Sequence, residues 1–196
     1  RMFNMVRELT VAEDDDSFRK LQERIVNYEQ ISDNMENEIG KYLEQVGNAH
    51  LSDDTKQKIR AMIRSISELE SIGDSCYNLS RTLERRRSQH LTFNQTQKDG
   101  IDEIYGLLDK SLGHMVLVLK GEADILDSSR LEDAINQCRD RLREQNVRSV
   151  DEHDYSYACS TIYMDLVAEC EKCGDYVVNV VEAKSGEDLE KPVLAL

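Results

Sequence analysis

The chain has 196 residues, of which 33% are charged and 6% aromatic, and its formal net charge is −14. It contains no tryptophan and a single proline, Pro192, a composition typical of an all-helical protein. The negative field repels nucleic-acid phosphates and anionic lipids, so it argues against direct binding to either and favours cations. The longest apolar string, MVLVL at 115–119, is too short to cross a bilayer, and no signal-peptide pattern opens the chain.

Apolar residues recur at alternating steps of three and four over long stretches, the spacing of helices that pack nearly parallel in a bundle. In chain order, this spacing predicts a short helix near 2–10 and long helices near 17–47, 53–87, 96–120, 126–147 and 151–184. The apolar seam passes through Met35, Ile39 and Tyr42 in the second helix, and through Met62 and Leu69 in the third. We therefore expect these five side chains to face neighbouring helices.

The expected helix ends carry capping residues. Ser52 precedes the third helix as an N-cap, and Ser149 with Glu152 three residues later reads as a capping box for the last one. The four arginines of RTLERRR at 81–87 close the third helix, where cations complement the helix dipole. Docking of this run onto a loop of a partner protein or an anionic headgroup is the alternative.

Two stretches about a hundred residues apart share their spacing: ESIGDSCYN at 70–78 and EKCGDYVVN at 171–179. With an offset of 101 residues, five of eleven positions are identical: Glu68/Glu169, Glu70/Glu171, Gly73/Gly174, Asp74/Asp175 and Asn78/Asn179. We interpret this as an internal duplication. The predicted fold is all-α, with two tandem antiparallel three-helix bundles related by a pseudo-twofold axis, at 1–90 and 91–186, followed by a C-terminal tail at 187–196.

The repeated stretch has the chemistry of a cation site. Glu70 and Asp74 are four residues apart, so they share one helix face, and Asn78 is expected to continue that stripe. Gly73 costs a helix about 1 kcal/mol relative to alanine, which predicts a close approach by a neighbouring helix.

The second helix offers a matching pair, because Glu29 and Asp33 flank its seam residue Ser32. If the two helices are antiparallel, four carboxylates converge, and such a cluster needs cations or basic partners; metal ions with oxygen ligands would serve. In the second bundle, Glu132 and Asn136 take the places of Glu29 and Asp33, so a weaker metal site is expected there.

Other cofactor chemistry is disfavoured. The five cysteines lack the spacing of a secreted disulfide scaffold, so we expect reduced thiols in an intracellular protein. Cys170 and Cys173 form a Cys-x-x-Cys pair without a second pair, and we interpret them as buried apolar residues. No Glu-x-x-His helix pair occurs, which argues against a ferritin-like di-iron oxidase.

These motifs resemble the PhoU family, whose signature is a twice-repeated Glu-Arg-Ile-Gly-Asp-x-x-x-Asn. Both copies depart from the signature at the arginine, which is Ser71 and Lys172 here, and Cys173 replaces the isoleucine of the second copy. The resemblance implies regulation of phosphate uptake, without enzymatic activity, and multinuclear iron or zinc at the carboxylates. The metal residues it implies are Glu29, Asp33, Glu70, Asp74, Glu132, Glu171 and Asp175. The structural residues of the motif are Gly73, Asn78, Gly174 and Asn179.

A finer resemblance concerns the context of the domain. The segments 31–43 and 59–82 look like the PhoU-like region at the C-terminal end of bacterial sodium/phosphate cotransporters, and a start at Arg1 fits an excised domain. This implies a place at the cytoplasmic face of the membrane, with the membrane domain of a phosphate transporter as partner, in the same chain or a separate one. The alternatives are a free-standing PhoU regulator, a metalloenzyme and a helical interaction module without metal. Homo-oligomerisation is compatible with each of them.

Overall fold

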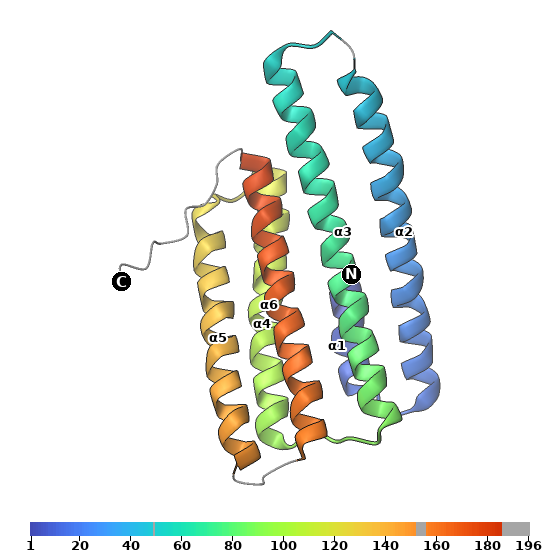
Figure 1. The fold of residues 1–196 in the computed structure, drawn as a ribbon, viewed down its shortest axis with the longest axis vertical. Helices are drawn as coiled ribbons and strands as arrows, with labels where there is room; N and C mark the ends of the chain where they lie inside the picture. Colours follow the sequence, from blue (N-terminus) through green and yellow to red (C-terminus); the bar gives the residue numbers. More distant parts are fainter. Residues whose placement is uncertain (49, 152–155, 186–196) are drawn as a thin grey trace.

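The computed structural model describes residues 1–48, 50–151 and 156–185, which fold into six α-helices without a strand among them (Figure 1). The first unit comprises α1 (Met2–Val11), α2 (Asp15–Gly47) and α3 (Asp53–Ser88). The second comprises α4 (Gln95–Lys120), α5 (Leu126–Asp151) and α6 (Tyr157–Ser185). The predicted all-α bundle fold is confirmed.

Side-chain caps fix most of the helix starts. Asp14 accepts a hydrogen bond from the backbone N–H of Ser17 at the start of α2, and Ser52 caps α3 as predicted. α4 begins with a full capping box between Asn94 and Gln97 and ends at Gly121, whose φ of 76° is the left-handed conformation that glycine tolerates best.

The predicted boundary between the last two helices is wrong. Ser149 lies inside α5, which continues to Asp151, so it does not begin the next helix. Instead, the Ser156 hydroxyl accepts a hydrogen bond of 3.3 Å from the backbone N–H of Cys159 and caps α6. Glu152, the other half of the predicted capping box, and the predicted tail at 187–196 lie outside the described residues.

The two units meet where α3 and α6 run side by side in opposite directions, the most extensive helix pairing of the molecule (Figure 1). One hydrophobic core passes through both units, with fully buried side chains such as Leu79 and Leu83 from α3 and Val180 and Val181 from α6. This pairing places the two copies of the repeated motif next to each other in antiparallel orientation.

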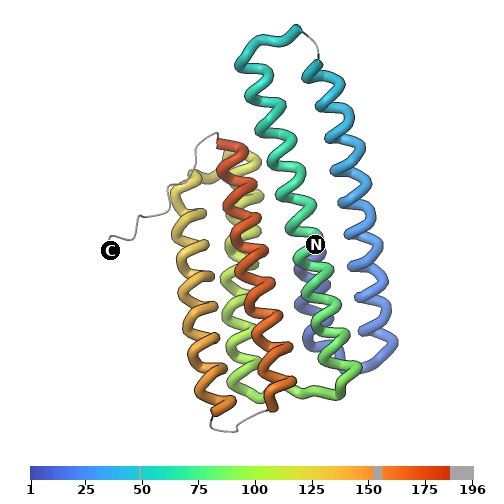
Figure 2. Tube along the Cα trace, viewed as in Figure 1, coloured from blue at the N-terminus to red at the C-terminus, as the bar shows by residue number. Residues whose placement is uncertain are grey.

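The upper part of the first unit has no third helix over it. α1 is 10 residues long, whereas its counterpart α4 has 26, and α2 and α3 rise beyond the end of the second unit (Figure 2). The predicted seam residues in this part are therefore exposed, with Met35 at 54%, Tyr42 at 64% and Met62 at 52%. The expectation that they face a neighbouring helix is wrong, because α1 covers only the lower part of α2 and α3. No helix in the described part of the chain is both long and apolar enough to span a membrane.

Candidate functional site

In each unit, a neighbouring helix packs against the glycine of the motif. α2 and α3 are antiparallel neighbours (Figure 1), and a Cβ atom at Gly73 would lie 3.4 Å from the Ser32 hydroxyl oxygen. In the second unit, a Cβ atom at Gly174 would lie 3.0 Å from Cδ1 of Ile135 on α5. At Gly73 the neighbouring helix lies at an ordinary contact distance, so the packing there does not itself require a glycine, whereas the contact at Gly174 is tighter.

Five carboxylates lie on the outer side of this approach in the first unit, and we call them the acidic patch: Glu29, Asp33, Glu36, Glu70 and Asp74. Burial raises the pKa of Glu70 to about 7, and the hydrogen bond and charge of Asp74 and the charges of Glu36 and Asp33 contribute in the same direction. Burial likewise raises the pKa of Glu29, helped by Asp74 and Asp33. The four carboxylates predicted from the sequence therefore do influence one another across α2 and α3.

The one cation shown to interact with the acidic patch among the described residues is Lys172, whose pKa is raised by the charge of Glu169 and, to a smaller extent, by that of Asp74. None of its five carboxylates forms an ion pair with a lysine or arginine in the described parts of the chain. The donor set is entirely carboxylate, which suits hard or borderline cations. Within residues 1–48, 50–151 and 156–185, however, no three His, Cys, Asp or Glu side chains are arranged so that they could hold a metal ion. Metal binding at the patch stays a prediction.

The equivalent place in the second unit holds an arginine. The guanidinium of Arg139 on α5 forms an ion pair with Glu171 on α6 and a hydrogen bond of 3.0 Å with Asp140. The hydrogen bond to Asp140 is the main cause that raises the pKa of Arg139, and the charges of Glu171 and Asp175 add to it. Two of the predicted metal ligands are thus already neutralised in part by a protein side chain. The sequence analysis missed Arg139. When α2 is aligned with α5, Arg139 occupies the position equivalent to Glu36.

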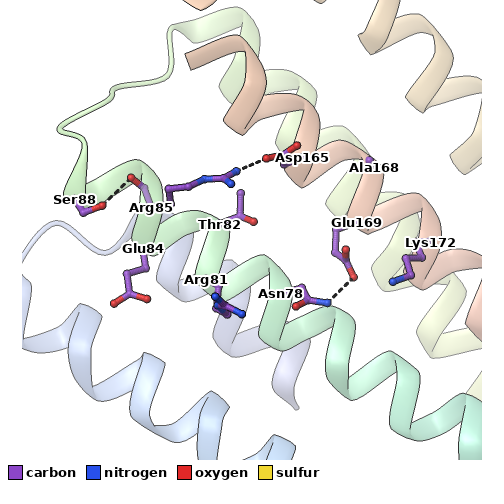
Figure 3. Close-up of a pocket in the computed structure, with 10 residues that line it drawn as sticks. All are labelled: Asn78, Arg81, Thr82, Glu84, Arg85, Ser88, Asp165, Ala168, Glu169 and Lys172. Atoms are coloured by element: carbon purple, nitrogen blue, oxygen red, sulfur yellow. Dashed lines mark hydrogen bonds and ion pairs between the residues drawn. The ribbon is translucent and has the colours of Figure 1, made fainter. Parts of the chain in front are cut away.

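The two asparagines of the motif do not belong to the carboxylate stripe. Asn78 points from α3 toward α6 and donates a hydrogen bond of 3.4 Å to Glu169 (Figure 3). Asn179 donates one of 3.0 Å from α6 back to Glu68. The expectation that Asn78 continues the stripe is wrong for a geometric reason, since eight residues from Glu70 turn a helix by about 80° beyond two full turns. The sequence signal for these contacts was the identity of Glu68 and Glu169 in the repeat.

A groove of about 690 Å³ runs beside the Asn78–Glu169 contact, between α3 and α6 (Figure 3). Arg85 closes one end of it through an ion pair with Asp165, and Lys172 lines the other end. Positive and negative side chains alternate along it, so the groove has no dominant charge.

The arginine run at 81–87 is mostly engaged within the chain. Arg87 donates to the backbone carbonyls of Ala12 and Glu13, just past the end of α1, and pairs with Asp15. Arg86 stacks on the ring of Phe93 at 5.0 Å. Arg85 also lines the groove but pairs with Asp165, whereas Arg81 lines it and lies over the ring of Tyr77 at 5.8 Å. External docking of the run stays a prediction, and it would depend mainly on Arg81.

The cysteines are buried, as the sequence analysis predicted for Cys170 and Cys173. All five are free and buried, and burial raises the pKa of the Cys170 and Cys173 thiols well above the ordinary value. Deep burial keeps these two thiols protonated, which disfavours metal binding by the Cys-x-x-Cys pair.

Comparison with known proteins points to one family. Residues 1–83 match the family model of the PhoU domain. The crystal structure of PhoU from Pseudomonas aeruginosa is similar over 93% of this chain and 88% of that chain, with a TM-score of 0.80 and 14% identity. The phosphate transport system regulatory protein PhoU from Streptococcus pneumoniae is similar over 97% and 91%, with a TM-score of 0.75 and 15% identity. No curated protein sequence gives a significant match. At these identities, the structural likeness shows the fold.

Proposed function

Because residues 1–83 are a PhoU family domain and the six helices have the PhoU fold, we propose that the chain is a PhoU-type regulator of phosphate uptake. The observation that carries the proposal is the structural match to PhoU over nearly the whole chain, which includes the second unit that the family model does not cover. The similar structure from Streptococcus pneumoniae is that of a phosphate transport system regulatory protein. The proposed role is regulatory, not catalytic.

The proposed partner is the membrane domain of a phosphate transporter, contacted from the cytoplasmic side. The solved relatives are PhoU proteins, which favours a free-standing regulator over the C-terminal domain of a sodium/phosphate cotransporter. The net charge of −14 disfavours nucleic acid and anionic lipid as partners and favours a basic surface on the transporter.

The second part of the proposal is a metal ion at the acidic patch, with iron or zinc as the candidates. Glu29, Asp33, Glu70 and Asp74 would hold it, since their oxygens suit such ions and their mutual repulsion calls for positive charge. When bound, the ion would supply that charge and join α2 to α3. Rotation of the carboxylates toward one point would be required, because no three of them converge in the described residues.

Phosphate uptake in cells tests the regulatory role. Cells from which the gene for this chain has been deleted should take up radiolabelled phosphate without restraint at high external phosphate, and expression of the chain should restore the restraint. The double variant Asn78→Asp with Asn179→Asp, which places carboxylates against Glu169 and Glu68, tests whether the restraint depends on the contact between the two units. Uptake that is the same with and without the chain would refute the proposal.

A further inference from the structure

Arg86, in the last turn of α3, lies between two grooves at the lower end of the first unit in Figure 1. The larger groove, of about 810 Å³, is bounded by the start of α2, the end of α3 and the segment 90–92 that leads to α4. The smaller one, of about 370 Å³, lies toward the end of α1 and the start of α4. Because Arg86 lines both grooves, its side chain borders open space on two sides.

Arg86 differs from the other sheltered arginines in having no counter-ion. Three arginines in the described parts of the chain are partly buried, and the others are exposed. Two of these three form ion pairs, Arg87 with Asp15 and Arg139 with Glu171. Among the described residues, no carboxylate pairs with Arg86. A partly buried guanidinium without an opposite charge is unfavourable, so this position calls for an anion.

The groups around Arg86 do not supply that negative charge. Its guanidinium donates one hydrogen bond of 3.4 Å to the backbone carbonyl of Thr10 and lies 5.0 Å from the ring centroid of Phe93. Burial lowers the pKa of Arg86, and the charge of Arg87 acts in the same direction. The groups that act in the opposite direction are the phenol of Tyr105 and a cysteine thiol, not carboxylates. The remaining N–H groups of Arg86 reach open space, because none of its nitrogen atoms is buried without a partner.

The larger groove is a cationic place on an acidic protein. Three arginines line it, Arg19, Arg86 and Arg87, against the two carboxylates Asp15 and Glu84, so its formal charge is +1. The chain as a whole has a net charge of −14. At 0.1 M ionic strength, charges farther away than about 10 Å are largely screened. The overall charge therefore does not prevent a small anion from binding in this groove.

The other polar groups of the groove suit a phosphate group. The hydroxyls of Ser88 and Thr92 and the imidazole of His90 line it together with Arg86. The planar fork of a guanidinium matches two oxygens of a phosphate, and hydroxyls bond to the others. A volume of about 810 Å³ is larger than one phosphate ion needs and falls within the range of small-molecule sites. The groove thus has room for the rest of a phosphorylated molecule.

We propose that Arg86 binds a phosphate group in this groove, carried by inorganic phosphate or by a small phosphate monoester. The bound phosphate supplies the counter-charge that Arg86 lacks within the chain. The proposal deepens the proposed function, on which its regulatory meaning rests: a regulator of phosphate uptake with this site responds directly to the ligand whose uptake it restrains.

The first test is calorimetric titration of the full chain at constant ionic strength, with inorganic phosphate and with glycerol phosphate as probes. One site per chain is expected. Binding of inorganic phosphate identifies the free ion as a ligand, and binding of glycerol phosphate alone identifies a monoester. Absence of binding by both probes, in the calorimeter and in the phosphorus NMR line width of the ligand, overturns the proposal.

The second test removes the guanidinium. Arg86→Gln should weaken binding by about tenfold or more, and Arg86→Lys by less, because an ammonium keeps the charge without the planar fork. Arg81→Gln is the matched control. It removes the same charge from the same helix and from a similar place over an aromatic ring, that of Tyr77, but it lines the groove between α3 and α6. Its affinity for the probes should be unchanged, and thermal unfolding verifies that all three variants are folded.

The third test adds affinity, a result that loss of folding cannot produce. Glu84 lines the groove, so Glu84→Gln removes a negative charge beside the expected phosphate and should tighten binding severalfold. Glu144→Gln, an exposed residue of α5 that pairs with Arg148, changes the net charge equally and should leave the affinity as it is.

The outcomes separate this proposal from the regulatory role. Binding that survives Arg86→Gln, that falls equally in Arg81→Gln, or that Glu84→Gln does not tighten overturns the site. In cells, Arg86→Gln should fail to restore the restraint of phosphate uptake. A restraint as strong as that of the original chain would overturn the response assigned to the site. A chain that binds phosphate through Arg86 but leaves uptake unchanged would refute the regulatory role and not the site.

Discussion

Asn78 on α3 donates a hydrogen bond to Glu169 on α6, and the equivalent residue of the second unit, Asn179, donates one back to Glu68. The two bonds are reciprocal, since each asparagine donates to the first glutamate of the other copy of the motif. Each copy of the motif thus uses three faces of one helix. Its asparagine and first glutamate join the units, its glycine contacts the neighbouring helix, and its second glutamate acts on groups of that same neighbouring helix.

The first prediction concerns this reciprocal pair. Asn179→Ala should lower the free energy of unfolding by about 1–2 kcal/mol, since it removes a 3.0 Å bond to a carboxylate, and Asn78→Ala by about 1 kcal/mol or less because its bond is longer. Asn179→Asp should cost more than Asn179→Ala at pH 8, because two carboxylates would then face each other. Chemical denaturation measures all three.

The control for this series is Asn37→Ala, whose exposed amide, among the described residues, bonds only to Asp33 of its own helix. It should change stability by less than about 0.5 kcal/mol. A loss in Asn37→Ala as large as that in Asn179→Ala would show that the bonds between units have no special role.

The second prediction concerns the glycines. Gly73→Ala should be neutral or slightly stabilising, because alanine favours the helix and the nearest atom to its Cβ, the Ser32 hydroxyl oxygen, lies at an ordinary 3.4 Å. Gly174→Ala should destabilise by about 1–2 kcal/mol, since the Ile135 side chain at 3.0 Å must move in a packed core. Thermal unfolding of the two variants provides the comparison. Equal changes in stability for the two variants would mean that the contact between Gly174 and Ile135 is less tight than in the structure.

The third prediction concerns pH. The pKa of Glu70 is about 7 in the folded chain, above its ordinary value of 4.5, so the folded state holds more protons than the unfolded state between these values. The contribution of Glu70 to stability is therefore present below pH 4.5 and is lost as the pH rises through 7. In metal-free protein, Glu70→Gln should be more stable than the original chain by about 1 kcal/mol at pH 8, an effect that solvent screening of the partly exposed patch keeps small.

Urea denaturation of the original chain and of Glu70→Gln, at pH 5 and pH 8 with chelator present, measures this difference. Asp14 and Asp16 titrate in both proteins, so their lowered pKa values cancel in the comparison. A gap between the two proteins that does not widen from pH 5 to pH 8 would contradict the proposed repulsion within the acidic patch.

Local signals predicted the helices well because the apolar spacing and the caps act within a few residues. Ser52 begins a helix as its sequence context indicates, whereas Ser149 has an equally good local pattern and lies inside one. The difference is that α5 continues past Ser149 and that Ser156 supplies the competing cap. Sequence patterns of this kind rank candidate caps poorly when two lie close together.

In the candidate site too, features within one helix could be predicted from the sequence, whereas contacts between helices could not. The mutual influence of Glu70 and Asp74 follows from their spacing along one helix. The ion pair of Arg139 with Glu171 joins two helices, and a search for repeated carboxylates passes over a basic residue. The bonds of the asparagines depend on how α3 crosses α6, which periodicity within either helix does not determine.

The last prediction follows from the lengths of the helices that cover the other two in each unit, since α1 has 10 residues and α4 has 26. Ile39 on α2 and Leu142 on α5 are equivalent positions, but Ile39 is 36% exposed and Leu142 1% exposed. α4 passes directly over Leu142, since a Cβ atom at Gly100 would lie only 2.9 Å from Cδ2 of that leucine. Leu142→Ala should therefore lower the free energy of unfolding by about 2–5 kcal/mol, through lost burial and a cavity. Ile39→Ala should cost about 1 kcal/mol or less, because its side chain already contacts water.

Chemical denaturation measures the stability of both variants, and Val147→Ala, a substitution at an exposed position of α5, is the control. A large loss for Ile39→Ala would mean that another surface covers this part of α2 in solution, and sedimentation of the original chain and the variant would then show whether that surface belongs to a second copy.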